Sequence, residues 1–210
     1  MAEKYYTVQD IATAEIEIMR SRFIAHVSPA ANEQEAINFI EKIKRQYRDA
    51  THNCSAYVIG VEHCQKASDD GEPSGTAGKP ILEAIKKTGV QDTVIVVTRY
   101  FGGTKLGAGG LVRAYGKSAY AGLEAATIIA QEPHAVVKIS CEYTMLGTID
   151  NYIRHSGCIV KSKDFAADVV ITVLVPCGDE QDIAVQIADR TGGQATLESI
   201  GFEYVAKVKI

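Results

Sequence analysis

A run of β-branched residues that leads into a glycine-rich segment is the strongest constraint on how this chain folds. Residues 93–98 read Thr-Val-Ile-Val-Val-Thr, which predicts a central strand buried on both faces. Residues 102–110 then contain five glycines, and an apolar pattern of helical period begins just after Gly109 and Gly110. We therefore predict a strand, a glycine-rich connection and a helix in direct succession.

The segments before this run also predict regular structure. Alternation over residues 14–25 predicts a strand, one arm of a hairpin, and Asn32 followed by Glu35 predicts a capped helix that runs to about residue 48. Residues 54–61 predict a buried strand followed by a loop. Residues 68–80 are too rich in Gly, Pro and acids for regular structure, and Pro80 suits the first turn of a helix that ends before a glycine.

The pattern changes after a polar break at residues 131–133. The segments that follow predict in turn a strand, a helix, a hairpin, a helix and a last strand, over residues 135–143, 145–156, 158–175, 178–191 and 202–210. The order βαββαβ is the ferredoxin-like arrangement. We predict an α+β protein with two domains, residues 1–133 and residues 134–210.

Composition and charge narrow the class of protein. The 210 residues are 46% hydrophobic and 23% charged, as in an average globular protein. No apolar run approaches the roughly 18 residues of a membrane span, and the start of the chain lacks a signal peptide pattern, so we expect a cytoplasmic protein without a membrane partner. Five cysteines without a CxxC pair predict reduced thiols.

The charge is unevenly distributed along the chain. The net charge is −4, yet every charged residue between positions 93 and 123 is basic, namely Arg99, Lys105, Arg113 and Lys117. Neither predicted domain is basic as a whole, which excludes general adhesion to nucleic acid. Any anion site must therefore be local.

The glycine-rich segment has the composition of such a local site. Glycines allow backbone amides to approach a ligand, and a helix N-terminus favours an anion. The predicted anion-binding or RNA-binding residues are Lys79, Arg99, Gly102, Gly103, Lys105, Gly107, Gly109, Gly110 and Arg113. In the alternative interpretation the glycines serve close packing, and the basic side chains pair with the acidic loop formed by Asp69, Asp70 and Glu72.

Two named phosphate motifs do not fit the sequence. A P-loop would need Gly where Pro73 stands and Ser or Thr where Pro80 stands. The dinucleotide pattern would need a small residue at Val112. We predict no nucleotide cofactor.

Two clusters have residue types that metal binding or nucleophilic catalysis uses. The acidic loop could hold Mg²⁺, although a solvated turn or an internal ion-pair partner is the favoured interpretation. The group His52, Cys54, His63 and Cys64 lacks a second close ligand pair at the spacing of zinc sites. Cys54 lies inside an apolar strand, which favours a core thiol over a nucleophile. We predict no metal ion.

Several motifs together resemble the IMPACT/YigZ family. They are Arg20–Ile24, Ala50–Tyr57, Asp69–Pro73, Gly78–Leu82, Arg99–Gly103 and Gly109–Tyr115, spread over residues 20–117. The resemblance implies an N-terminal α+β domain like the second domain of a small-subunit ribosomal protein, and a C-terminal domain like one near the end of elongation factor G. Eukaryotic relatives carry an additional RWD domain through which they modulate the amino-acid-starvation response, and we expect no such module before Arg20.

The resemblance implies a cytoplasmic protein that acts on or near the translation machinery and binds RNA, with no established reaction. We therefore expect a non-enzymatic regulator of translation whose partners are RNA, ribosome-associated factors or another phosphate-bearing ligand; Tyr100 or Phe101 would stack on a base if exposed. An enzyme of metal-assisted phosphoryl transfer or hydrolysis, acting on a nucleotide or phosphorylated metabolite, is the alternative. A third interpretation assigns function to protein contacts through the C-terminal sheet. The oligomeric state stays open.

Overall fold

The computed structural model describes residues 3–60 and 64–208, which form two compact units. The N-terminal unit comprises Tyr5–Ala130. The C-terminal unit comprises Gln131–Lys207 and also includes Glu3 and Lys4. No helix among the described residues is long and apolar enough to cross a membrane.

A five-stranded antiparallel sheet organises the N-terminal unit. The strand order is β2-β3-β6-β4-β5, with bounds β2 Ala12–Ile18, β3 Ser21–Pro29, β4 His52–Ile59, β5 Cys64–Ser68 and β6 Thr93–Tyr100. Strand β6 is central: Val97 faces Ala25 on β3 and Cys54 on β4. The β-branched run is therefore buried on both faces, as its sequence predicts.

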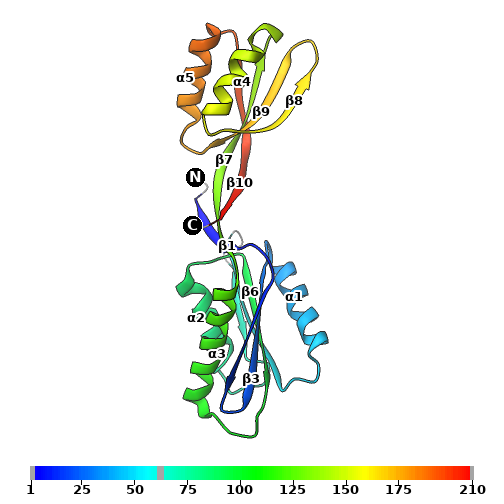
Figure 1. Cartoon of the computed structure of the whole chain (residues 1–210). Coiled ribbons are helices and arrows are strands. Elements are labelled where there is room, and N and C mark those ends of the chain that lie inside the picture. Colours follow the sequence, from blue (N-terminus) through cyan, green and yellow to red (C-terminus); the bar gives the residue numbers. More distant parts are fainter. Residues whose placement is uncertain (1–2, 61–63, 209–210) are drawn as a thin grey trace. The chain divides into compact units, whose positions relative to one another are not determined.

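Helices cover both faces of this sheet (Figure 1). Helix α1 (Glu33–Gln46) packs on one face, and α2 (Gly78–Thr88) and α3 (Gly107–Ala125) pack on the other. Alternate residues of β6 serve the two cores, because successive side chains of a strand point to opposite faces. Ile95 and Val97 contact the α2–α3 side, whereas Val94 and Val96 contact the α1 side.

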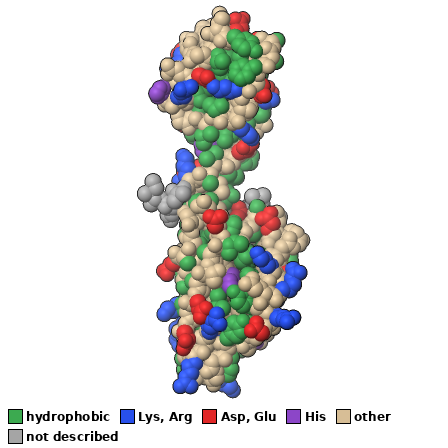
Figure 2. Space-filling model, turned by 45° about the vertical axis from the view of Figure 1, so that its right-hand side comes forward, with side chains coloured by type: hydrophobic (Ala, Val, Ile, Leu, Met, Phe, Trp, Pro, Cys, Tyr) green, Lys and Arg blue, Asp and Glu red, His purple; other side chains and the backbone are tan. Residues whose placement is uncertain are grey.

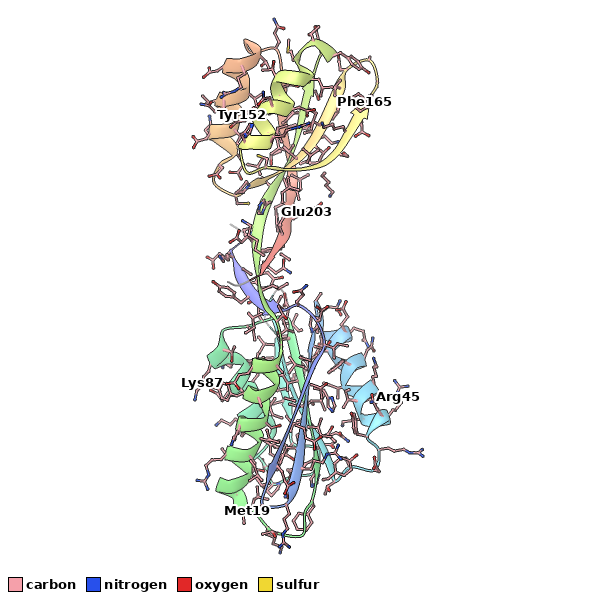
Figure 3. The ribbon with its side chains drawn as sticks, in the orientation of Figure 1. Met19, Arg45, Lys87, Tyr152, Phe165 and Glu203 are labelled. Carbon is pink, nitrogen blue, oxygen red and sulfur yellow. The ribbon has the colours of Figure 1, made fainter. Side chains whose placement is uncertain are left out.

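Local signals determine where these elements begin and turn. The Asn32 side chain accepts a hydrogen bond from the Glu35 amide at 2.9 Å, which is the predicted cap of α1. Helix α2 ends at Gly89, whose φ of 73° is left-handed. The turn between β2 and β3 has positive φ at both Met19 and Arg20, as a two-residue hairpin turn of type I′ requires (Met19 is labelled in Figure 3).

Four predictions in or next to the N-terminal unit are wrong. The single strand expected over residues 14–25 is instead the two strands β2 and β3, separated by the turn at Met19 and Arg20. Residues 64–68 form strand β5 where a loop was expected, because this polar, exposed edge strand has no apolar alternation. Helix α3 begins at Gly107, so Gly109 and Gly110 lie inside its first turn. The polar residues 131–133 do not break the chain, since β7 (Ile128–Cys141) runs through them. The short strand β1 (Tyr5–Val8) was not predicted.

The C-terminal unit has the predicted ferredoxin-like order. Its elements are β7, α4 (Leu146–His155), β8 (Ile159–Phe165), β9 (Val169–Pro176), α5 (Glu180–Thr191) and β10 (Thr196–Val208), with a 3-10 turn at Tyr143–Met145. The strand order is β10-β7-β9-β8. Side chains from β7, β9 and both helices form the core, and the Arg190 guanidinium lies 4.5 Å from the ring centroid of Tyr152 (Figure 3).

The end of β6 packs closely against the β2–β3 turn, and this gives a first prediction. A Cβ at Gly102 would lie 1.9 Å from the Arg20 carbonyl oxygen, a contact that the backbone cannot relieve locally. Gly102→Ala is therefore expected to lower the free energy of unfolding by about 2 kcal/mol or more, measured by urea denaturation.

Gly109→Ala is the matched control, because a Cβ there meets nothing within 4 Å and the residue is helical. This variant is expected to be neutral or to gain up to about 1 kcal/mol. Equal stability of the two variants would contradict the close approach of Gly102 to the Arg20 carbonyl group.

Candidate functional site

A buried ion pair lies where the acidic loop meets the end of β6. The Arg99 Nη1 atom lies 2.6 Å from the Glu72 Oε1 atom, and the two residues are only 6% and 8% exposed. The same carboxylate accepts a hydrogen bond from the Tyr115 hydroxyl at 2.8 Å, which links the loop to α3. Arg99, a predicted phosphate ligand, therefore has an internal counter-charge from the acidic loop.

Cys54 continues this polar network into the core. Its thiol donates to the Asp69 carbonyl oxygen at 2.9 Å and lies 3.3 Å from the Tyr115 hydroxyl. Burial raises the pKa of Cys54 to about 12, and burial also raises the pKa of Tyr115. Cys54 is thus a protonated thiol at neutral pH, which favours the interpretation as a core residue over that of a nucleophile.

Asp69 caps helix α2. Its carboxylate accepts hydrogen bonds from the amides of Gly75, Ala77 and Gly78 at 2.8, 3.0 and 2.8 Å. Burial acts to raise the pKa of Asp69, but these three amide donors outweigh it, and the pKa is lowered. The anion-binding end of α2 is therefore occupied by a carboxylate of the chain itself.

Asp70 has different partners. Its carboxylate accepts from the Lys44 ammonium at 2.8 Å and from the Asn53 amide at 2.7 Å. The three carboxylates of the acidic loop thus turn to three separate sets of partners. The described residues contain no group of three or more metal-ligating side chains, and His63 lies outside the described residues.

The start of α3 is open by comparison. No described side chain caps the helix, and Lys105 and Gly107 just before and at its start are exposed. Gly103 and Gly107 have φ values of 84° and 72°, so the backbone path requires glycine there. Gly109 is exposed, and a Cβ there would meet nothing within 4 Å. The first amides of α3 therefore have no competing side chain.

A cleft of about 350 Å³ joins these features. Its lining includes Glu72, Arg99, Lys105 and Gly107 of the predicted site, together with His52. Its apolar wall is formed by Pro73, Phe101, Leu106 and Leu111. The remaining predicted residues do not line it: Lys79, Gly102, Gly103, Gly109, Gly110 and Arg113 lie outside the cleft lining.

A second groove, of about 430 Å³, lies between α2 and α3. Lys79, Lys87 and the half-exposed Tyr120 line it, and Lys87 points outward from α2 (Figure 3). Of these residues, only Lys79 is a site residue predicted from the sequence; Lys87 and Tyr120 are not. The sequence signal that could have identified Lys87 is the positive charge of the last turn of α2, where Lys86 and Lys87 are adjacent.

The fold and the cleft define a two-domain α+β protein whose N-terminal domain carries a glycine-rich helix start over a buried ion pair. Residues 19–123 match the Impact N-terminal domain, and residues 139–194 match a domain of unknown function, DUF1949. The chain therefore belongs to the IMPACT family, as its motifs indicated.

Individual relatives agree over nearly the whole chain. The chain is 45% identical to the IMPACT family member YvyE of Bacillus subtilis, covering 99% of this chain and 96% of that protein. It is 34% identical to the IMPACT family member YigZ of Escherichia coli, covering 88% and 92%. A crystal structure of a hypothetical protein is similar at a TM-score of 0.63, with 32% identity and coverage of 95% of this chain and 98% of that one.

The buried ion pair gives a second prediction. Glu72→Gln keeps the shape of the side chain but leaves the buried Arg99 guanidinium without a counter-charge. The expected loss in unfolding free energy is about 3–5 kcal/mol, measured by urea denaturation. The exposed Glu124→Gln on α3 is the control, with an expected change within about 0.5 kcal/mol.

A double variant separates the coupling energy of the ion pair from the effect of changing either residue alone. Because Glu72→Leu combined with Arg99→Met removes both charges, it is expected to cost less than the two single variants added together. Additive losses, or a Glu72→Gln variant as stable as the control, would show that the pair has no coupling.

The cap of α2 gives a third prediction. Asp69→Asn is expected to lower the unfolding free energy at pH 7 by about 1–2 kcal/mol, because the ionised carboxylate accepts from three amides. The folded state lowers the pKa of Asp69, so its contribution is complete above the unfolded value of about 3.9 and is lost as pH falls through the folded value.

The difference between wild type and Asp69→Asn should therefore be constant from pH 5 to 7 and shrink below about pH 4. Asp10→Asn, at an exposed position of the same unit, is the control and should show no such difference. A difference that grows on acidification would refute the capping role.

Proposed function

We propose that the protein binds RNA of the translation machinery through the surface formed by α2, α3 and the loop before α3, here called the α2–α3 surface. One observation carries the proposal: six basic side chains on this surface are exposed, and none forms an ion pair with another described residue. They are Lys79, Lys86, Lys87, Lys105, Arg113 and Lys117. Only Glu83 and Glu124 of α2 and α3 are acidic.

The concentration of positive charge is local. The whole chain carries a net charge of −4, and acidic and basic side chains are interspersed over the face visible in Figure 2. Several lysines elsewhere have acidic partners, as Lys44 has Asp70 and Lys163 has Asp150. Unpaired cations gathered on one surface are the electrostatic footprint of phosphate binding.

The groove between α2 and α3 adds an aromatic group to this charge. Tyr120 is 37% exposed and lines the groove together with Lys79 and Lys87. Aromatic rings flanked by cations favour single-stranded nucleic acid, because bases stack on the ring while phosphates meet the cations. These features support a single-stranded or looped RNA as the ligand.

The link to translation comes from the family. The IMPACT family resemblance implies a protein that acts on or near the translation machinery in the cytoplasm, and membership of the family supports carrying that role to this chain. The role assigned to Arg99 changes in one respect. Its ion pair with Glu72 positions the glycine-rich loop, so the exposed lysines and Arg113 make the phosphate contacts.

The geometry favours binding over phosphoryl transfer. A metal-assisted reaction at the acidic loop would need free carboxylates. Asp69 is engaged with three amides, Asp70 with Lys44 and Asn53, and Glu72 with Arg99 and Tyr115. A metal there would have to displace partners that hold the loop in place.

Charge removal on the α2–α3 surface gives a fourth prediction. Lys79→Gln/Arg113→Gln/Lys117→Gln is expected to weaken binding of a single-stranded RNA and to reduce the slope of log K against log salt by about 2, at roughly 0.7 per phosphate contact. Fluorescence anisotropy of a labelled RNA oligonucleotide at several salt concentrations measures both quantities.

The matched control removes three exposed charges from the opposite side of the sheet. Lys42→Gln/Arg45→Gln/Arg48→Gln lies on and just after α1 and carries the same change in net charge (Figure 3 labels Arg45). It should leave the salt slope within experimental error of wild type. Equal weakening by both triple variants, or no RNA binding by the wild type at low salt, would refute the proposed surface.

A further inference from the structure

His52 places an oriented imidazole nitrogen at the cleft. The Nδ1 atom lies 2.8 Å from the Asp70 carbonyl oxygen, and because a carbonyl only accepts, Nδ1 carries the proton. The Nε2 atom then faces the Glu72 Oε2 atom at 3.9 Å, which is too long for a hydrogen bond. The imidazole is therefore fixed by one nitrogen while the other has no close partner among the described residues.

Arg99 supplies an independent sign of a missing partner. The residue is 6% exposed, and its guanidinium carbon lies 5.6 Å from the Phe23 ring centroid and 5.5 Å from that of Phe101. Its Nη1 atom binds Glu72, but its buried Nε atom has no hydrogen-bond partner among the described residues. A buried donor without a partner is costly, and this one belongs to a residue that lines the cleft.

The rim of the cleft is positive. Lys105 is exposed without an ion pair among the described residues, and α3 begins at the rim with Gly107 and no side-chain cap. The N-terminus of a helix carries roughly half a positive charge and offers free amides to an anion. Unlike the start of α2, which Asp69 occupies, this helix start is open.

From these groups we propose that the cleft binds a phosphate monoester, the terminal phosphate of a nucleotide. Lys105 and the start of α3 together supply the positive charge that a dianion requires, whereas the charge of Arg99 is balanced by Glu72. Phe101 and Leu106 offer an apolar wall to the attached sugar or base. The inference rests on the proposed function only for the claim that a nucleotide carries the phosphate.

The size of the cleft favours a terminal phosphate over an internal one. A volume of about 350 Å³ lies near the small end of ligand sites, which begin at roughly 300 Å³. An internal phosphodiester carries one charge and must accommodate a sugar on both sides. A monoester carries a second charge and enters from one side, which suits a small cleft whose lining includes the buried Arg99–Glu72 pair.

The first experiment compares adenosine 5′-monophosphate with adenosine by calorimetry on the full chain. The monophosphate is expected to bind at least about tenfold more tightly than adenosine, and Lys105→Ala is expected to remove about tenfold of its affinity, as for loss of one charge-assisted contact. Lys42→Ala on α1 is the control and should leave the affinity unchanged. Thermal unfolding of each variant verifies that it folds.

Equal binding of the two compounds, no binding at millimolar concentration, or equal effects of the two lysine variants would overturn the inference.

A second experiment identifies the source of the monoester with two RNA hexamers that differ only in a 5′-phosphate or 5′-hydroxyl end. A higher affinity of the phosphorylated hexamer, lost in Lys105→Ala, assigns the cleft to an RNA end. Equal affinity of the hexamers, with discrimination between the two adenosine compounds, assigns it to a free nucleotide.

The two proposals can fail separately. If neither hexamer binds at low salt but the monophosphate binds as expected, RNA binding by the α2–α3 surface is refuted and the cleft stands. If both hexamers bind equally through the α2–α3 surface and the monophosphate binds no better than adenosine, the cleft assignment is refuted and the proposed function stands.

Discussion

The ion pair between Arg99 and Glu72 is the interaction on which the arrangement of the N-terminal unit depends. It joins three separate parts of the chain: the end of β6, the acidic loop and, through the Tyr115 hydroxyl, helix α3. Removing two charges from water is expensive, and an apolar pair of similar volume is often as stable. The main contribution of the pair is therefore to position the acidic loop, which it holds beside the start of α3, and its contribution to stability is smaller.

The position of the loop in turn determines which helix start is available to a ligand. With Glu72 held by Arg99, Asp69 reaches the amides at the start of α2 and neutralises that end. The start of α3 receives no such side chain and opens beside Lys105. Two helices on the same face of one sheet thus end up with opposite properties, one closed by the chain and one open.

Much of the fold could be predicted from local sequence because the signals were local. The β-branched run of β6, the Asn32 cap and Gly89 each acted within a few residues, and the βαββαβ order followed from periodicity. Strand β5 was missed because edge strands need no apolar alternation. The polar residues 131–133 looked like a break in the chain, but they lie half-buried inside β7, because a strand can carry polar side chains.

The candidate site was harder to predict than the fold, because its chemistry depends on residues that are distant from one another in sequence. The composition of residues 99–113 indicated an anion site, with internal pairing as the alternative. In the structure Arg99 pairs with the acidic loop, whereas Lys105 and Gly107 line an open cleft, and anion binding there stays a prediction. No spacing rule relates Arg99 to Glu72, 27 positions apart, or places His52 beside them. The same applies to Tyr120, which is placed beside Lys79 only by the packing of α2 on α3.

The two regions of positive charge differ in what they can recognise. On the α2–α3 surface all the cations except Lys105 stand on exposed turns of helix, so they can follow a flexible chain of phosphates and discriminate little between sequences. In the cleft the donors are held by other groups: Arg99 by Glu72 and the α3 amides by the helix itself. Donors fixed in advance lose little entropy on binding and select a ligand by shape and charge. A surface that gathers RNA and a cleft that reads a terminal phosphate would therefore act on the same molecule in different ways, the first setting how strongly it is held and the second which end of it is recognised.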